Sequence, residues 1–405
     1  MKVYFVVKEP SERTINHFVS SLGNALQKQE CEVVYGWERL WTNDVLECDI
    51  VHFQWPEFIF GSDIKHISDE KVERLRLRLV LLTGKKIKVF VQIHNLKPHV
   101  NQDKNVLRLY KLLYQHADVM VHMGKYSRDL LQPQYPNAQH VMIPHHIYDE
   151  IYNFDYTREE ARERLRLPAD KKIVLSFGKF RNDKERNFVL SLKNKCSSWP
   201  PAPLKGEKAT ECATTPTHRT ATNTLATREK ATECAATPPL GGRGANSPIF
   251  LMPGFYRESL HTWNPKKLVT RLYHTLCYKL KGIKFCNEVI PDDLMQCYFC
   301  AADVVLLQRL DILNSGNLPM AFAAGKVVVG PDVGNVGQIL NETGNFTFDP
   351  HDIKSAESAL QKALTETTKG KENKTYATEH WSSDLIAAKL LKYYRETKYK
   401  KDEDY

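Results

Sequence analysis

Basic side chains that could bind phosphate follow a predicted strand at residues 172–178. Arg181 and Lys184 lie three positions apart at the expected start of the next helix. A guanidinium binds two phosphate oxygens at once and a nearby ammonium adds a second charge, so this pair is suited to clamping a pyrophosphate. A run of solvated charges is the alternative interpretation of the same residues.

A second anion site is predicted after the apolar strand at residues 304–307. Ser315, Gly316 and Asn317 open a short helix, and Gly325 ends it in the left-handed conformation that glycine adopts most easily. The first N–H groups of a helix have no partner within it and lie at the positive end of its dipole. The segment therefore favours a phosphorylated ligand in a doubly wound domain.

Aromatic and polar residues follow a predicted strand at residues 50–53. Trp55 and Glu57 could stack on a sugar ring and bind its hydroxyl groups. A packed corner with Trp55 in the core is the alternative.

Two histidines follow another predicted strand at residues 89–93. His94, Asn95 and His99 could orient a sugar or stabilise developing charge. Histidine used only to cap a strand is the alternative. A metal site is disfavoured, because neither histidine has a carboxylate or cysteine at ligand spacing.

Alternating strands and helices must position these four loops. Strands are expected at residues 3–7, 32–35, 50–53, 89–93 and 119–122, then at 172–178, 249–252, 284–285, 304–307 and 327–329, with helices at 14–29 and 104–116. This alternation indicates parallel sheets covered by helices on both faces, with ligands at the carboxyl ends of the strands. We therefore expect two successive doubly wound domains, residues 1–150 and a second from residue 151.

One segment, residues 197–247, departs from this alternation. It is rich in Thr, Ala, Pro, Gly and Lys, and residues 207–216 recur with small changes as residues 229–238. Such a composition buries too little apolar surface to offset chain entropy. We predict a disordered low-complexity insertion whose loss leaves the fold intact.

Composition limits the class of protein. A chain of 405 residues with 42% hydrophobic residues fits two packed α/β domains. It has no run of 18 uncharged apolar residues, and its first residues resemble a strand more than a signal peptide. The nine cysteines lack a framework spacing, and Cys297 and Cys300 are expected to be buried thiols in a helix. A cytoplasmic location is therefore expected.

The net charge of +9 favours anionic partners, and much of the excess lies in residues 71–88 and after Lys392. Lipid headgroups, pyrophosphates and nucleic acid all suit such a surface, and a solvated helix face is the alternative. Nucleic acid is disfavoured, because no zinc finger, basic zipper or RNA-binding aromatic motif accompanies the charge. The sequence also lacks GxGxxG, GxxxxGK[ST] and GxSxG motifs.

The order and spacing of the motifs resemble bacterial glycosyltransferases of the GT-B fold. The resemblance is to the large retaining type (glycosyltransferase group 1, family 4-like), which includes many enzymes of cell-surface polysaccharide and lipopolysaccharide synthesis. It rests on DIVHFQWPE (49–57), VQIHNLKPH (91–99), LSFGKFRNDKE (175–185), IPDDLMQCYFCAADVVLL (290–307) and DILNSGNLPMAFAAGKVVVGPDVG (311–334).

This resemblance implies two Rossmann-like domains that face a cleft. The second domain would end at residue 376, and residues 377–405 would form a helix that packs back on the first domain, followed by a charged tail. The donor would be a nucleoside-diphosphate sugar and the acceptor a glycan or lipid-linked glycan, with no metal or other cofactor. Residues 71–88 would contact the anionic inner face of the plasma membrane.

The resemblance also assigns roles to single residues. The catalytic group would be His94, Arg181 and Lys184; the donor would be bound by Asn287, Glu288, Asp311, Ser315, Gly316 and Asn317; and the sugar or acceptor would be contacted by Trp55, Glu57, Asn95 and His99.

The chain departs from the family pattern at two glutamates that are usually eight positions apart. The matching positions hold Asp311 or Ile312 and Met320, and Gln338 stands where a further glutamate is frequent. The donor sugar and its base therefore stay open.

Four interpretations of the function stay open. A retaining transferase needs no paired carboxylates, because the leaving diphosphate can take the acceptor proton while the enzyme stabilises its charge. An inverting transferase would need a carboxylate base, with Glu57 and Asp103 as candidates. The alternatives from other classes are a nucleotide-sugar epimerase and a non-catalytic nucleotide-binding protein.

Overall fold

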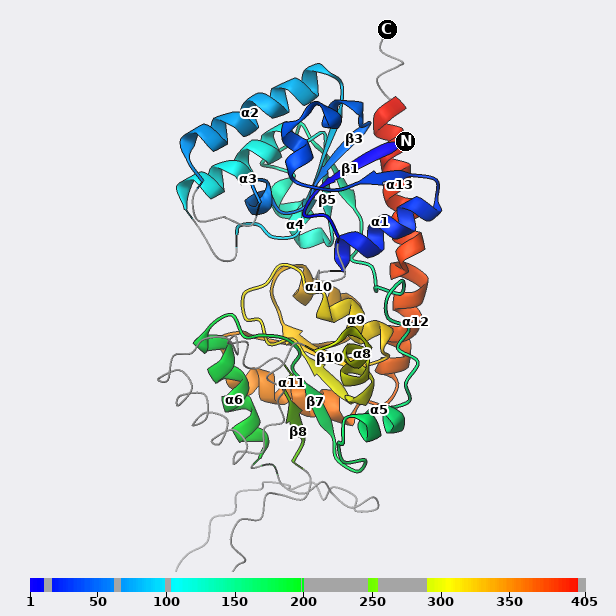
Figure 1. Cartoon of the computed structure of the whole chain (residues 1–405). Coiled ribbons are helices and arrows are strands. Elements are labelled where there is room, and N and C mark those ends of the chain that lie inside the picture. The colour runs from blue at the N-terminus through cyan, green and yellow to red at the C-terminus, as the bar shows by residue number, and fades with distance from the viewer. Residues whose placement is uncertain are drawn as a thin grey trace, which may run out of the picture.

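Two α/β domains, each built on a parallel sheet, lie one above the other in the computed structural model (Figure 1). The structure describes residues 1–10, 17–61, 67–98, 103–197, 199, 247–253 and 290–399. Most of the predicted insertion and the strand expected at residues 284–285 lie outside these ranges.

The first sheet has six parallel strands in the order β2-β1-β3-β4-β5-β6. They are β1 (Lys2–Val6), β2 (Glu32–Val34), β3 (Ile50–Phe53), β4 (Lys88–Ile93), β5 (Val119–His122) and β6 (Gln139–Met142). All five strands expected in this half are confirmed, and β6 is added at the edge. The chain leaves β1 towards β2 and returns on its other side as β3. The topological switch point, where ligands bind in such sheets, is therefore between β1 and β3.

Helices cover both faces of this sheet. They are α1 (Phe18–Lys28), α2 (Asp69–Gly84), α3 (Lys104–His116) and α4 (Lys125–Leu131), with short 3-10 turns η1 (Glu38–Trp41), η2 (Asn43–Glu47) and η3 (Pro56–Phe58). α2 and α3 pack together on one face, and α1 packs with the last helix of the chain on the other. The six residues of β4 are buried, as expected for a central parallel strand.

The second sheet has five parallel strands in the order β11-β10-β9-β7-β8. They are β7 (Ile173–Leu175), β8 (Ile249–Leu251), β9 (Val304–Leu306), β10 (Val327–Pro331) and β11 (Phe346–Phe348). The first strand of the domain again lies inside the sheet, with β8 on one side and β9 on the other. Its switch point is therefore between the carboxyl ends of β7 and β9.

Helices cover this sheet as well. They are α5 (Arg158–Arg164), α6 (Asp183–Cys196), α8 (Asp292–Ala301), α9 (Asn317–Ala323), α10 (Gly334–Glu342), α11 (Ile353–Thr365) and α12 (Lys369–Trp381); the last helix of the chain, α13 (Ser383–Tyr399), belongs to the first domain. α6 and α11 share one core with the sheet. The predicted helix end at Gly325 is confirmed, since its φ of +66° is left-handed. Cys297 and Cys300 are buried in α8, as expected.

The chain crosses back to the first domain at its C-terminal end. α12 packs on α9 of the second domain, and α13 packs on α1 of the first, as Figure 1 shows. The break between these helices is fixed to the interdomain linker. Trp381 O accepts a hydrogen bond from Ile147 N at 3.0 Å, and Ser383 N donates to Asp149 Oδ1 at 3.0 Å.

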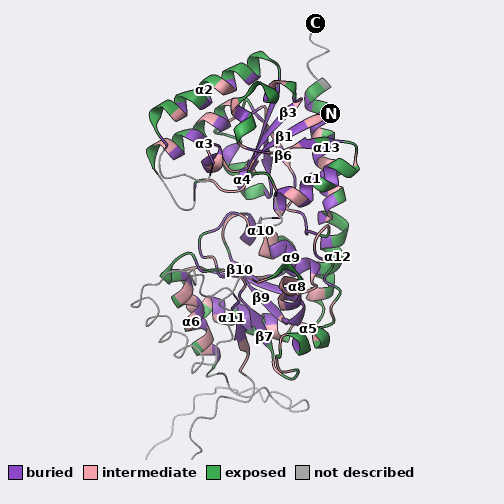
Figure 2. Cartoon of the chain, viewed as in Figure 1, coloured by how far each residue is buried: buried purple, intermediate pink, exposed green. Residues whose placement is uncertain are grey.

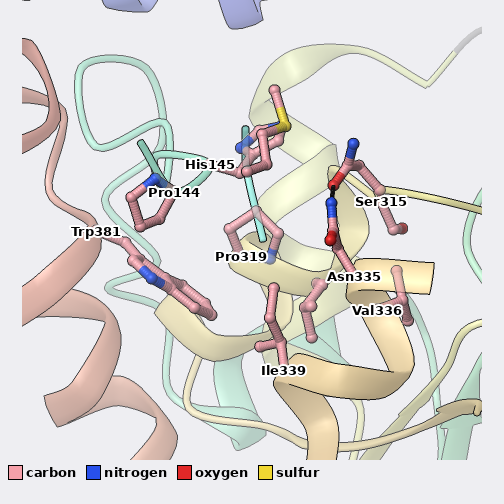
Figure 3. Close-up of a pocket in the computed structure, with 11 residues that line it drawn as sticks. Pro144, His145, Ser315, Pro319, Asn335, Val336, Ile339 and Trp381 are labelled. Carbon is pink, nitrogen blue, oxygen red and sulfur yellow. Dashed lines mark hydrogen bonds between the residues drawn. The ribbon is translucent and has the colours of Figure 1, made fainter. Parts of the chain in front are cut away.

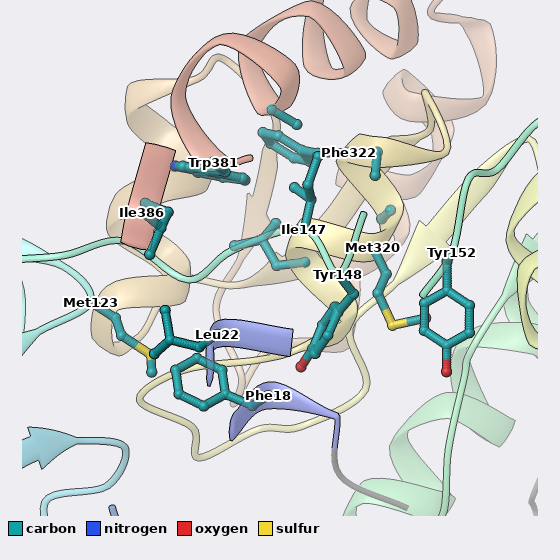
Figure 4. Close-up of a cluster of buried hydrophobic side chains, with 14 of the residues drawn as sticks. Phe18, Leu22, Met123, Ile147, Tyr148, Tyr152, Met320, Phe322, Trp381 and Ile386 are labelled. Atoms are coloured by element: carbon teal, nitrogen blue, oxygen red, sulfur yellow. The ribbon is translucent and has the colours of Figure 1, made fainter. Parts of the chain in front are cut away.

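One apolar core runs through the junction of the two domains. Phe18 of α1, Tyr148 of the linker, Phe322 of α9 and Trp381 of α12 belong to a single buried cluster (Figure 4), and the rings of Phe322 and Trp381 stack 5.1 Å apart. Figure 2 shows buried residues continuing from each sheet into this junction. The domains therefore share part of their core.

The ends of the predicted insertion lie close together. Ser247 Oγ donates to Ser197 O at 3.5 Å, just after α6 and just before β8. Trp199 belongs to the folded part, because its ring Nε1 donates to Glu357 of α11 at 2.9 Å. The segment that can be removed without touching described contacts is therefore 200–246.

Candidate functional site

Arg181 lies in the loop after β7, beside the switch point of the second sheet. Gly178 in this loop has a φ of +96°, a conformation that glycine adopts without strain. Arg181 Nη1 reaches the backbone carbonyl of Asp311, from the loop after β9, at 3.5 Å. The structure thus brings these two predicted site residues together. Partial burial lowers the pKa of Arg181, and the positive charge of Arg309 lowers it further.

A buried carboxylate, Glu185 in the first turn of α6, organises the same loop. It is 3% exposed, and its Oε2 accepts hydrogen bonds from Arg181 N and from Arg309 Nη1, both at 2.9 Å. Asn182 caps the helix by accepting from Glu185 N. Lys184 is exposed on this turn. The loop that carries Arg181 is therefore held in place by the buried carboxylate of Glu185.

The predicted helix start at residues 315–317 is packed against its neighbours. A Cβ at Gly316 would lie 2.9 Å from Tyr148 Oη of the linker, so glycine permits this close approach. Asn317 Nδ2 donates to Phe177 O at 2.9 Å and holds the loop after β7. Ser315 lines a cavity of about 20 Å³ with His145, shown in Figure 3. That volume holds about one water molecule, too little for a nucleotide.

His94 and Trp55 come together at the carboxyl edge of the first sheet. Their rings stack with centroids 4.1 Å apart, and the edge of Phe18 packs on His94 at 4.8 Å. His94 Nε2 donates to Gln54 Oε1 at 2.9 Å, which leaves Nδ1 as a hydrogen-bond acceptor. Burial, followed by the neighbouring His145, holds the pKa of His94 well below its usual range. His94 is therefore a neutral ring of fixed orientation.

The other two described residues predicted on this edge, Glu57 and Asn95, contact tyrosines of α3. Glu57 is 5% exposed and accepts a hydrogen bond from Tyr110 of α3 at 2.5 Å. Burial raises the pKa of Glu57, and the bond from Tyr110 lowers it in part. Asn95 accepts from Tyr114 through its backbone carbonyl at 3.2 Å. Their contact with an acceptor stays a prediction.

Three predicted site residues, His99, Asn287 and Glu288, lie outside the described residues.

The carboxyl edges of the two sheets meet directly. Asn314 Nδ2, from the loop after β9, donates to the carbonyl oxygens of Ile93 and His94 at 3.1 and 2.9 Å. Asn335 of α10 is fully buried behind it and donates to Asn314 Oδ1 at 2.8 Å, while its own Oδ1 accepts from Ser127 N of α4 at 3.0 Å. Polar contacts thus join the loop of His94 to the loop after β9.

The chemistry that this arrangement offers is anion binding on one edge and sugar binding on the other. Guanidinium groups stand at the β7–β9 switch point, and an aromatic pair stands on the facing edge. Within the described residues, no group of three or more His, Cys, Asp or Glu side chains is placed to hold a metal ion.

Comparison with solved structures finds the same two-domain arrangement elsewhere. Sucrose-phosphate synthase from Thermosynechococcus elongatus matches with a TM-score of 0.65 and 14% identity over 98% of each chain. HepE of Anabaena, solved in complex with UDP-glucose, matches with a TM-score of 0.61 and 10% identity over 98% of this chain and 100% of that one. The chain has the GT-B fold.

A third GT-B structure is the catalytic domain of starch synthase IV from Arabidopsis thaliana, bound to ADP and acarbose. It matches with a TM-score of 0.59 and 10% identity over 98% of this chain and 99% of that one. No protein-family model matches the sequence, and comparison with curated proteins finds no significant match. At these identities the likeness concerns the fold.

Sequence reasoning missed three residues of this GT-B cleft. Gln54 is the first residue after the predicted strand at 50–53, and Arg309 is the second after the predicted strand at 304–307. A search of every strand end for polar residues would have found both. Glu185 had no such signal, because a glutamate in the first turn of a helix is common and its bond to Arg309 joins residues 124 positions apart.

Proposed function

We propose that this chain is a glycosyltransferase that moves a sugar from a nucleoside-diphosphate sugar to a glycan or lipid-linked glycan. The observation that carries the proposal is that Arg181, beside the β7–β9 switch point, contacts the loop after β9, and that this same loop contacts His94 of the stacked pair through Asn314. The likeness to structures that hold UDP-glucose and ADP adds support. The resemblance of the motifs favours cell-surface polysaccharide or lipopolysaccharide synthesis, in the cytoplasm.

The transfer would retain configuration and use no metal. As the bond to the sugar breaks, negative charge grows on the leaving diphosphate, and Arg181 would stabilise it in a partly desolvated site. The diphosphate would then take the acceptor proton on the same face. His94, neutral and fixed by Gln54, would present Nδ1 to a sugar hydroxyl, and Trp55 would hold the ring of His94 in place.

Ser315, Gly316, Asn317 and Asp311 would complete the donor side, and Asn95 and Glu57 the acceptor side. Because Gly316 packs against Tyr148, donor binding at residues 315–317 would require the linker to move away. Lys184 would add positive charge at the rim. These roles follow the resemblance of the motifs.

Contact with an anionic membrane would be made by α2. Leu77, Val80 and Leu81 are 55%, 50% and 39% exposed, and their spacing of three and four places them on one side of the helix. Arg74 lies over the Trp41 ring at 4.4 Å, and Trp41 stacks on Phe60 at 4.6 Å. Exposed apolar residues beside basic and aromatic ones suit a lipid interface. No described helix is long and apolar enough to cross a bilayer.

A thermal-shift screen tests the donor assignment. A ligand that binds only the native protein raises its Tm by an amount that grows with concentration. UDP, GDP, ADP and their glucose and mannose derivatives are compared, followed by hydrolysis and transfer assays with the best binder. A protein that none of these ligands stabilises would contradict the proposed function.

A further inference from the structure

Arg309 is a cation that neither the sequence motifs nor the comparisons assign. It is the third residue after β9, on the strand that borders the switch point. Its side chain is 20% exposed, and its Nη1 donates to Glu185 Oε2 at 2.9 Å. The guanidinium of Arg309 therefore binds from the β9 side the same carboxylate that the backbone N–H of Arg181 binds from the β7 side.

The two guanidinium groups lie close enough to affect each other. After partial burial, Arg309 is the largest cause of the lowered pKa of Arg181. Placing like charges together in a partly desolvated site is unfavourable without a counter-ion. Glu185 is the buried counter-ion of Arg309, and the negative charges of Glu185 and Asp311 both act on Arg181. Two guanidinium groups beside one switch point suit an anion with two charges, such as a diphosphate.

Two orphaned polar atoms flank the same switch point. Ser176, directly after β7, and Gln308, next to Arg309, are 0% and 2% exposed. Ser176 Oγ and Gln308 Oε1 have no hydrogen-bond partner in the described part of the chain. Gln308 is otherwise fixed, because its Nε2 donates to Phe177 O at 2.8 Å. Buried atoms of this kind are costly to leave unpaired, and functional sites are one place where proteins keep them.

We infer that Arg309 and Arg181 together bind the diphosphate of the donor, and that Glu185 is the positioning residue that orients Arg309. The inference rests on the proposed function and changes which cation binds the diphosphate together with Arg181. This second cation is Arg309, and Lys184, which is exposed on the first turn of α6, contributes less to binding. A guanidinium held by one nitrogen keeps its remaining N–H groups in a fixed plane, which favours two-point binding of a phosphate.

The test is titration calorimetry with UDP, GDP and ADP. We expect Arg309→Gln to raise the Kd of the best-bound nucleotide by about 10- to 100-fold, which is the range of a lost charge-assisted hydrogen bond. Arg309→Lys should recover only part of the loss. Lys184→Gln should change the Kd by less than about threefold, which is well below the change expected for Arg309→Gln. The control is Arg186→Gln, which removes a partly exposed arginine of the same helix that pairs with Asp183.

A second variant separates binding from folding. Arg309→Gln leaves the carboxylate of Glu185 buried without its counter-ion, so the double variant Arg309→Gln/Glu185→Gln removes both charges and keeps groups that can form hydrogen bonds. It should restore the Tm and still bind the nucleotide weakly. Binding by the double variant close to that of the wild type would overturn the inference, as would a larger loss in Lys184→Gln. If the wild type binds no nucleotide, the proposed function fails and the inference fails with it.

Discussion

Asn335→Ala should loosen the two domains without disturbing either sheet. The side chain of Asn335 is fully buried and forms three hydrogen bonds. Its Oδ1 accepts from Ser127 N at 3.0 Å, and its Nδ2 donates to Ser127 Oγ at 3.2 Å and to Asn314 Oδ1 at 2.8 Å. Alanine removes all three and leaves a buried N–H of α4 without an acceptor.

The magnitude follows from these contacts. A net value of about 1 kcal/mol for each bond, together with about 1 to 3 kcal/mol for one unpaired buried donor, gives a loss of about 4 to 6 kcal/mol in the free energy of unfolding. At about 2 to 4 °C per kcal/mol for domains of this size, the Tm should fall by roughly 8 to 24 °C. The radius of gyration from small-angle scattering should rise, because these bonds join α4 of one domain to α10 and the Asn314 loop of the other.

Asn341→Ala is the matched control, since Asn341 lies on the same helix but is exposed and bonds to Asp332 within its own domain. Its Tm should change by no more than about 1 °C, as for other surface substitutions. A Tm and a radius of gyration for Asn335→Ala that equal those of the control would refute the reasoning, because they would show that the buried amide does not hold the domains together.

Three further predictions concern other parts of the chain. Deleting residues 200–246 should leave the Tm within a few degrees of the wild type, since loop closure depends weakly on length; loss of cooperative unfolding would show a structural role for the segment. Arg181→Ala should lower turnover by about two to three orders of magnitude while the Tm of the ligand-free protein stays nearly constant; full activity would disprove the diphosphate contact. Leu77→Gln/Leu81→Gln should weaken sedimentation with anionic vesicles, and wild-type binding should fall as salt rises; binding that ignores both changes would exclude α2 as the membrane contact.

The sequence predicted the central strands better than the edge strands. β3 and β5 were predicted at their observed bounds, because buried parallel strands are continuous apolar runs. β6 and β11 were missed, and each is the edge strand of its sheet with only one fully buried residue. An edge strand is covered on fewer sides, so its residues include polar ones and its pattern is weak.

The loops of the site were predictable, but the contacts between them were not. His94, Trp55 and Arg181 follow strands, and strand ends carry the sites of doubly wound domains. The bond from Asn314 to His94 O and the bond from Arg309 to Glu185 span 220 and 124 positions. The first depends on how the two sheets are placed against each other and the second on how α6 packs beside the loop after β9, and no local pattern encodes either placement.

We expect the two chain crossings between the domains to act together as a hinge. The linker and the start of α13 pass from one domain to the other side by side, pinned by the bonds from Ile147 to Trp381 and from Ser383 to Asp149. Two pinned crossings oppose twisting and sliding and leave rotation about the line through them as the easy degree of freedom. Such a rotation would carry the edge with His94 away from the edge with Arg181. In the proposed transferase, opening would admit a bulky donor, and closing by the same rotation would align the reacting groups.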